Sequence, residues 1–276
     1  MIRLLSYNIH RCVGTDRRLS SERIAEVIDS CDADIVALQE VDVGRMRTGA
    51  ADQAQDIARH LGMMPHFHAA LTVQEEQYGD AILTRRPSRL MQAGPLPGLA
   101  GRPNLEPRGA LWVAVDVAGK ELQVINTHFG LNGGERLRQA ETVLGDDWLA
   151  HPRCQDPAVL IGDFNAVPRS RAYRRLAQDL SEARHLAGNC DPGATYPSRL
   201  PLLRIDHAFL RGAVSVRSVK SIRTPLTRVA SDHLPLLLEL ELAPSPGHAR
   251  TGARDEADAP ASDQLRTMRQ PANGAA

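Results

Sequence analysis

Polar side chains that can perform chemistry recur at the ends of short apolar runs in this sequence. They are Asn8 in LSYNIH, Glu40 in IVALQE, His128 in VINTH, Asp163 and Asn165 in LIGDFN, Asp206 in RIDH, and Asp232 and His233 in VASDHLP. A single one of them is typical of a turn or of a structural histidine. Their repetition favours a site, because loops held by a rigid sheet are where sites are usually built.

The residue types indicate which chemistry this site performs. Carboxylate and amide oxygens without thiolates select a hard cation such as Mg²⁺ or Mn²⁺. His128, His233 and a free aspartate can move protons. Asn165 can donate a hydrogen bond to an anionic oxygen. This combination predicts metal-assisted phosphoryl hydrolysis.

Strands and helices alternate along most of the chain, and strands dominate its last third. The expected strands are 2–9, 34–40, 80–85, 109–117, 121–128, 158–165, 205–210, 214–222 and 234–241, and the expected helices are 20–31, 54–61, 137–148 and 170–180. Gly62 and Pro65 are expected to end the second helix. This order of elements predicts a layered α/β domain, with sheets inside and helices outside.

Composition separates a folded region, 1–242, from the segment 243–276. The latter has few large apolar residues and many Ala, Pro, Gly and charged residues, which predicts a disordered tail. The four cysteines contain no CxxC pair, so we expect reduced thiols in a cytoplasmic protein. We expect a monomer without a signal peptide, and no apolar run is long enough to span a membrane.

The formal net charge of the 276 residues is zero. Dedicated DNA-binding proteins tend to carry a basic excess, so the neutral total argues against that class. A local basic rim can be hidden by a neutral total. The arginines that can form such a rim are Arg85, Arg86, Arg89, Arg102 and Arg108.

The ordered set of motifs SYNIH, LQEVD, INTHFG, IGDFNAVP, RIDH and SDHLPL resembles the endonuclease/exonuclease/phosphatase superfamily over roughly residues 2–241. Each motif is short and weakly specific alone, whereas their order is highly specific. The resemblance implies an α/β fold of the DNase I-like type, a four-layer α/β/β/α sandwich, with the site at the rim of the sheets.

The resemblance also implies a role for each strand-end residue. Glu40 would be the main metal ligand with Asn8 and Asp232 nearby, and Asp163 would orient or deprotonate the attacking water. Asn165 would hold the phosphate, His233 would touch the phosphate or accept a proton while Asp206 orients it, and His128 would assist the leaving group. Arg108 would bind the phosphate.

One position departs from the family pattern. The segment YGDAILTR carries Asp80 where the family usually has asparagine. This carboxylate can pair with His128, add a metal contact or repel a polyanion, and the sequence leaves the three alternatives open.

The sequence therefore predicts a Mg²⁺- or Mn²⁺-dependent phosphoesterase. A small-molecule or lipid-borne substrate is slightly favoured, and action on DNA is the main alternative. A non-catalytic binding module on the same fold, and an adaptor that works through its tail, are further alternatives. The presence of all the expected catalytic residues argues against the binding module.

Truncation after Leu242 should leave the melting temperature and the turnover nearly unchanged, because the composition of 243–276 offers little apolar surface to bury. Thermal denaturation and steady-state kinetics of the truncated and full-length chains would check this. A drop of several degrees, or a large loss of turnover, would show that the segment docks on the domain.

Overall fold

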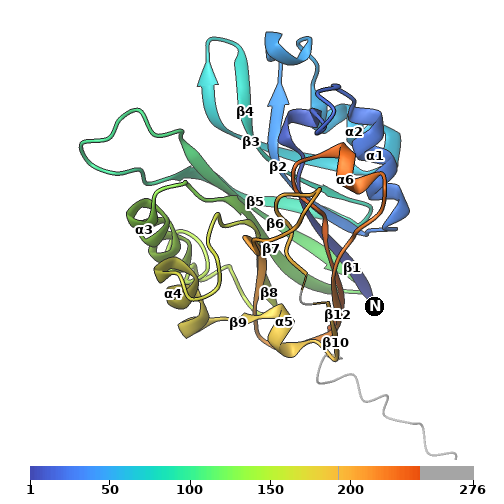
Figure 1. Ribbon diagram of the computed structural model, residues 1–276. Coiled ribbons are helices and arrows are strands. Elements are labelled where there is room, and N and C mark those ends of the chain that lie inside the picture. The colour runs from blue at the N-terminus through green and yellow to red at the C-terminus, as the bar shows by residue number, and fades with distance from the viewer. Residues whose placement is uncertain (192, 243–276) are drawn as a thin grey trace, which may run out of the picture. The chain divides into compact units, whose positions relative to one another are not determined.

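Two mixed β-sheets lie face to face and helices cover their outer faces in the computed structural model, which describes residues 1–191 and 193–242 (Figure 1). The first sheet has the spatial order β10 (Asn189–Cys190), β12 (Val214–Ser221), β13 (Leu236–Leu242), β1 (Ile2–Asn8), β2 (Ile35–Val43), β4 (Glu76–Thr84), β3 (Met64–Val73). The second has the order β5 (Ser88–Leu96), β6 (Arg108–Val117), β7 (Lys120–His128), β8 (Ala158–Asp163), β11 (Asp206–Arg211), β9 (Ser181–Glu182).

The helices form the two outer layers and some of the connections. They are α1 (Ser21–Ser30), α2 (Gln53–Leu61), α3 (Gly133–Leu144), α4 (Arg171–Asp179) and the short α5 (Ala183–Leu186) and α6 (Thr227–Ala230), with 3-10 turns η1 (His10–Cys12) and η2 (Met46–Thr48). No helix among these is long and apolar enough to cross a membrane. The expected four-layer α/β/β/α sandwich is confirmed. The expected tail and its boundary concern residues 243–276, which lie outside the described part of the chain.

Three apolar clusters explain the four layers. The buried stripe of α1, with Ile24 and Ile28, packs with α2 on the outer face of the first sheet. A second cluster, which includes Leu4 and Val124, fills the space between the sheets. A third lies between the second sheet and helices α3 and α4. Burial on both faces of the sheets accounts for their nearly continuous apolar central strands.

The direction of the strands brings the polar strand ends together. β1 runs parallel to β2 with Asn8 opposite Gln39, and β7 runs parallel to β8 with His128 opposite Asp163. Parallel neighbours end at the same edge of a sheet, and both pairs end at the same edge of the sandwich. Side chains far apart in sequence meet there, as do Asn8 and Asp163, which are 155 residues apart.

The sequence analysis missed β3 and β5 because both are edge strands. Residues 64–73 and 88–96 are polar or half-buried at most positions and contain Pro65 and Pro95. Proline is tolerated where a strand's N–H groups need no partner, which is the case at a sheet edge. Pro65 therefore lies in a strand and does not end α2, which stops at Gly62 with a left-handed φ of 64°. Trp148, expected in the third helix, lies after the end of α3.

A buried asparagine bridges the two sheets at a bulge in β2. The pairing of β2 with β4 shifts register between Leu38 and Val41. Asn126 of β7 is fully buried and donates to the carbonyl oxygens of Leu38, at 2.8 Å, and Ala81, at 2.9 Å. Its own oxygen accepts a 2.7 Å bond from the side chain of Gln39. Asn126 thus pairs polar groups at the bulge that water cannot reach.

Replacing Asn126 with leucine should lower the free energy of unfolding by roughly 3 kcal/mol, because two buried carbonyls and the Gln39 amide lose a partner. Urea denaturation would measure the change. Asn104→Leu, at an exposed position, is the matched control and should change stability little. Equal stability of the two variants would show that the sheets do not depend on this bridge.

Candidate active site

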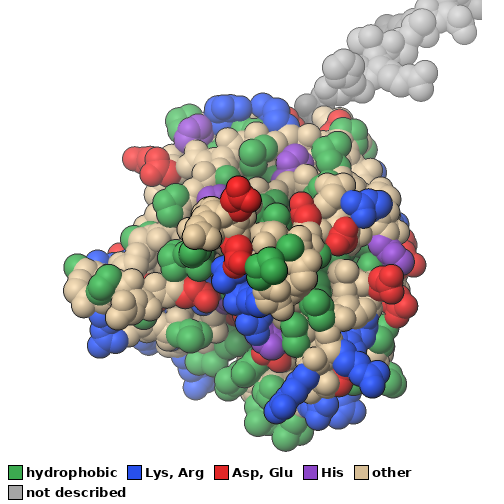
Figure 2. Space-filling model, turned by 90° about the horizontal axis from the view of Figure 1, so that it is seen from above, with side chains coloured by type: hydrophobic (Ala, Val, Ile, Leu, Met, Phe, Trp, Pro, Cys, Tyr) green, Lys and Arg blue, Asp and Glu red, His purple; other side chains and the backbone are tan. Residues whose placement is uncertain are grey.

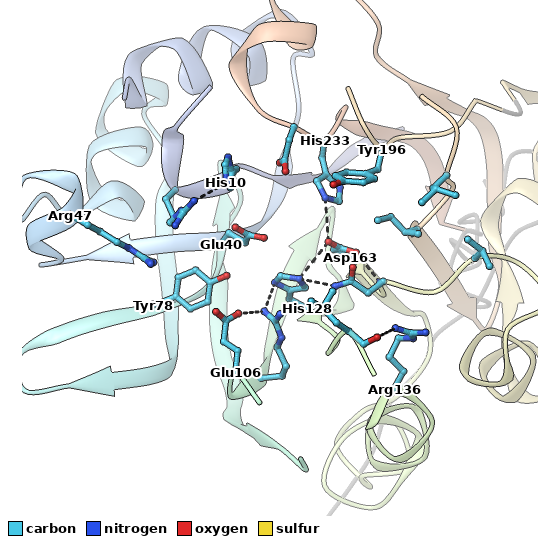
Figure 3. Close-up of a pocket in the computed structure, with 18 residues that line it drawn as sticks. His10, Glu40, Arg47, Tyr78, Glu106, His128, Arg136, Asp163, Tyr196 and His233 are labelled. Carbon is cyan, nitrogen blue, oxygen red and sulfur yellow. Dashed lines mark hydrogen bonds and ion pairs between the residues drawn. The ribbon is translucent and has the colours of Figure 1, made fainter. Parts of the chain in front are cut away.

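A pocket of about 560 Å³ opens at the edge of the sandwich where the parallel strands end (Figure 3). It is lined by most of the predicted site residues, namely Glu40, Arg108, His128, Asp163, Asn165, Asp232 and His233. Asn8 and Asp206 are fully buried behind its wall. The structure therefore gathers all the predicted side chains in one place, either on the pocket surface or in contact with a residue on it.

Glu40 reaches the pocket because of the bulge in β2. Its backbone has a φ of 60°, an unusual value for a residue other than glycine. Such backbone outliers cluster at functional sites, where surrounding structure holds them in place. The carboxylate of Glu40 accepts a 3.1 Å hydrogen bond from the amide nitrogen of Asn8, which also donates to Asp163 at 3.0 Å. Asn8 therefore spaces two carboxylates that would otherwise repel each other.

A buried proton network occupies the floor of the pocket. His233 Nδ1 lies 2.9 Å from Asp206 Oδ2, and its Nε2 lies 3.6 Å from Asp163 Oδ2. Asp206 also accepts a bond from the Thr195 hydroxyl. Burial alone would lower the pKa of His233, but the carboxylates of Asp206 and Asp163 outweigh it and raise that pKa. Burial raises the pKa of Asp163 above its ordinary value, although His233 opposes the shift. This network can hold and transfer a proton near neutral pH.

His128 is held neutral beside this network. Arg108 can only donate, and its Nη1 lies 2.9 Å from His128 Nδ1, so Nδ1 must accept. Burial, together with the charges of Arg108 and His233, holds the pKa of His128 well below its ordinary value. The neutral ring then carries its proton on Nε2, which lies 3.1 Å from Asn165 Nδ2 and 3.5 Å from Asp163 Oδ2. The acceptor nearest to this proton is Asp163 Oδ2, because the Asn165 side-chain nitrogen is itself a donor.

Asn165 and the turn after β8 are fixed by the backbone. Asn165 has a left-handed φ of 47°, its N–H donates to Asp163 Oδ1 at 2.8 Å, and its side chain donates to the Phe129 carbonyl at 2.9 Å. The Asp-Phe-Asn segment is therefore a turn stabilised by its own aspartate, as well as part of the site.

The side chains present fit a hard cation, although the predicted ligands do not converge on one point. Within residues 1–191 and 193–242, only Asp163, Asp206 and His233 place ligand atoms within 4.8 Å of one another. Their polar atoms already face one another in the proton network. Glu40, in contrast, lines the pocket and makes no ion pair with any described residue. The side-chain oxygen of Asn8 accepts a 3.1 Å hydrogen bond from the His10 N–H. The side-chain nitrogen of Asn8 holds Glu40 in place.

The local basic rim that the sequence left open is not formed. Arg85 and Arg86 follow β4 at the opposite end of the sheet and pair with Asp32 and Asp34. Arg89 likewise pairs with Glu121 at the far end of β7. Arg102 lines a smaller neighbouring pocket. Of the five arginines, only Arg108 lines the site, and Glu106 neutralises it at 2.7 Å.

Asp80 does not pair with His128, which was one of the three alternatives that the sequence left open. Asp80 is 2% exposed, and Arg108 binds His128 instead. Burial raises the pKa of Asp80 well above its ordinary value, an effect that the Arg108 charge opposes and Glu40 reinforces. A carboxyl buried in this way does not repel a polyanion at the surface.

Several pocket residues were not among the predicted site residues. They are His10, Arg11, Arg47, Tyr78, Glu106, Leu131, Arg136, Val167, Tyr196, Leu203 and Ile205. Arg47 lies 5.4 Å from the Tyr78 ring centre and forms two hydrogen bonds with buried Asp42. Four of them lie within motifs already singled out in the sequence, namely His10 in SYNIH, Tyr78 in YGDAILTR, Val167 in IGDFNAVP and Ile205 in RIDH.

Comparison with known proteins agrees with this geometry. The sequence model of the endonuclease/exonuclease/phosphatase family matches residues 5–233, and the chain belongs to this family of phosphoester hydrolases. The uncharacterised protein YbhP of Escherichia coli K12 is 25% identical over 259 residues, which cover 87% of this chain and 96% of YbhP.

Two solved structures share the fold. An endonuclease/exonuclease/phosphatase from Bacteroides vulgatus has a TM-score of 0.71 at 22% identity and covers 88% of this chain and 99% of its own. The mannosyl-6-phosphatase Bt3783 of Bacteroides thetaiotaomicron has a TM-score of 0.70 at 19% identity and covers 88% of this chain and 100% of its own.

Asp206→Asn should lower the pKa of His233, because the substitution removes the charge that most strongly raises it. His233 is protonated below its raised pKa, so any activity that needs the imidazolium should be lost at a lower pH in the variant. NMR titration of the histidine ring protons would measure the shift, with Asp56→Asn on α2 as the control. An unchanged His233 pKa would contradict the assigned network.

Proposed function

We propose that this protein is a Mg²⁺- or Mn²⁺-dependent phosphoesterase that hydrolyses its substrate by attack of an activated water. The observation that carries the proposal is the Asp163–His233–Asp206 network, which lies on the floor of a pocket that also presents the unpaired carboxylate of Glu40. A proton acceptor and a free anionic ligand in one pocket are what this reaction needs.

Asp163 would orient the water and take its proton. It is 1% exposed, and Asn8, the Asn165 N–H and His233 hold its oxygens. Burial weakens its acidity, which makes it a better base near neutral pH. His233, which is protonated below its raised pKa, would stabilise the negative charge of the phosphate, and Asp206 keeps the ring in the required orientation.

Glu40 would hold the cation, with Asp232 also lining the pocket and Asn8 keeping Glu40 in position. A bound Mg²⁺ or Mn²⁺ would supply charge stabilisation to the phosphoryl oxygens. Oxygen ligands of this type match the preference of both ions.

The opposite wall would bind the phosphate. Asn165 and His128 line the pocket, and their side-chain N–H groups would donate to the anionic oxygens of a bound phosphate in place of their present acceptors, the Phe129 carbonyl and Asp163. Arg108 adds positive charge behind His128. Neutral His128 would also donate its proton to a leaving oxygen.

The substrate we propose is a small or lipid-borne phosphoester. Duplex DNA binding depends on cationic side chains that displace counterions. Arg85, Arg86 and Arg89 are paired with acids at the far end of the sheets, and Arg47 is paired with Asp42. None of these four arginines is therefore free to bind a DNA backbone beside the pocket.

Hydrolysis of bis(p-nitrophenyl) phosphate should require the metal and the carboxylates. EDTA should abolish turnover, and Mg²⁺ or Mn²⁺ should restore it. Glu40→Gln removes the ligand charge and should reduce turnover by on the order of a hundredfold or more. Asp163→Asn should reduce it by roughly 10²–10⁴-fold, because the base is lost.

Glu121→Gln is the matched control, because this carboxylate lies at the far end of β7 and pairs with Arg89. It should keep full activity. Circular dichroism would verify that all variants fold. Full activity in EDTA after dialysis, or near-normal turnover of Asp163→Asn, would refute the proposed mechanism.

A further inference from the structure

Large apolar side chains are exposed beside the mouth of the pocket. Leu131 is 74% exposed, Val167 41% and Leu203 44%, and all three line the pocket. Leu200, 63% exposed, and Leu202, 71% exposed, belong to the same segment as Leu203. We call these five residues the leucine rim. Exposed apolar groups that gather at one site mark a binding surface.

The segment that carries three of these leucines is tightly fixed. Leu203 and Tyr196 exchange two backbone hydrogen bonds, and Leu202 N–H donates to the Tyr196 carbonyl at 2.9 Å. The side chain of Ser198 donates to the Ser231 carbonyl at 2.6 Å. These bonds hold the leucines in solvent and prevent them from folding back onto the core. The exposure is therefore a built feature of the site.

The same segment is joined directly to the proton network. Thr195 donates to Asp206, and Ser198 N–H donates to the carbonyl of Asp232 at 2.7 Å. The Tyr196 ring packs against His233 with ring centres 4.9 Å apart. The leucine rim is thus continuous with the catalytic floor, so a substrate held by that floor lies next to the rim.

Positively charged groups surround the leucine rim. Arg199 and Arg228 are exposed, and neither forms an ion pair with a described carboxylate. Arg199 donates to Thr15, and Arg228 donates to the Arg199 carbonyl at 2.8 Å. Arg136 donates to the Leu131 carbonyl at 2.6 Å. Arginines beside exposed leucines are the arrangement that attracts an anionic lipid surface and allows apolar side chains to enter it.

Figure 2 shows the molecule from above the view of Figure 1, with basic, acidic and histidine side chains lying beside hydrophobic ones.

A nucleobase or sugar fits the mouth of the pocket poorly. Bases are bound by stacking on aromatic rings, and one face of Tyr196 is already occupied by His233. Sugar hydroxyls need polar partners, which leucine and valine side chains do not supply. Aliphatic chains need apolar contact alone.

We infer that the leucine rim contacts the aliphatic chains of an anionic phospholipid whose phosphoester enters the pocket. This inference rests on the proposed phosphoesterase function and deepens it by naming the substrate class. The leucines enter the outer lipid layer, the nearby arginines bind its phosphates, and the phosphoester reaches Asn165 and His128 on the wall of the pocket.

The test uses sedimentation with vesicles of long-chain phosphatidic acid in phosphatidylcholine, beside vesicles of phosphatidylcholine alone. The full chain should bind the anionic vesicles. The double variant Leu200→Ser/Leu202→Ser should bind more weakly by about tenfold or more, because two exposed leucines that enter the lipid layer are lost from the contact. Leu90→Ser/Leu186→Ser, which changes two exposed leucines outside the pocket, is the matched control and should bind like the unaltered chain.

A second measurement does not depend on the serine variants folding. Leu202→Trp keeps an apolar side chain, and its fluorescence should shift to shorter wavelength when anionic vesicles are added, since the indole leaves water. Vesicle binding that is equal in both double variants, or an unshifted emission, would overturn the inference. The inference would also be overturned if the unaltered chain forms a dimer that Leu200→Ser/Leu202→Ser dissociates, and if the unaltered chain does not bind vesicles.

Turnover of soluble bis(p-nitrophenyl) phosphate by the unaltered chain separates the two proposals. Turnover without vesicle binding would reject the lipid surface and leave the phosphoesterase function in place. Vesicle binding without turnover of either the soluble ester or phosphatidic acid would reject the catalytic proposal and, with it, the assignment of the lipid as substrate. Turnover of both, with vesicle hydrolysis reduced in the leucine rim variant alone, would support both.

Discussion

The hydrogen bonds of Asn126 across the gap between the sheets are the constraint on which the site depends. A bulge in β2 gives Glu40 its left-handed backbone and aims its carboxylate into the pocket. The bulge interrupts the pairing of β2 with β4 in a dry interior, where unpaired polar groups are costly. Asn126 satisfies the carbonyls of Leu38 and Ala81 and holds Gln39. The same hydrogen bonds of Asn126 therefore join the two sheets and stabilise the bulge that directs the Glu40 carboxylate into the pocket.

The second consequence of burying the site between sheets is electrostatic. Asp163, Asp206, Asp80 and His233 are each less than 5% exposed, so their charges can be balanced only by one another and by Arg108. The fold balances them through hydrogen bonds that share protons, as between His233 and Asp206. Burial in this arrangement also raises the pKa of Asp163 to about 7, in the pH range where catalysis operates.

The pattern of elements predicted a layered α/β domain and the edge where the site lies, because central strands have continuous apolar runs and end on polar residues. The four-layer arrangement was implied by the resemblance of the motifs to the family. The pattern did not predict β3 and β5, whose edge position weakens it. The sequence analysis singled out His128 in INTHFG and overlooked Asn126 two residues earlier. A buried asparagine that bridges two sheets leaves no periodic pattern in the sequence. The sequence could not exclude a basic rim, because it does not show that Arg85 pairs with Asp32 at the far end of a sheet.

The two sides of the pocket arise from different kinds of structure. Glu40, His128 and Asp163 lie on paired strands, whose register leaves little freedom, while Leu131, Val167 and Leu203 lie on connections outside the helices and strands. Connections tolerate substitution without loss of the core, so one catalytic floor can be combined with many rims. In this chain the rim is apolar and is bonded to the floor through Thr195 and Ser198. The residues proposed to select the substrate are thus separate in sequence from those proposed to catalyse the reaction, although hydrogen bonds hold the two groups together in space.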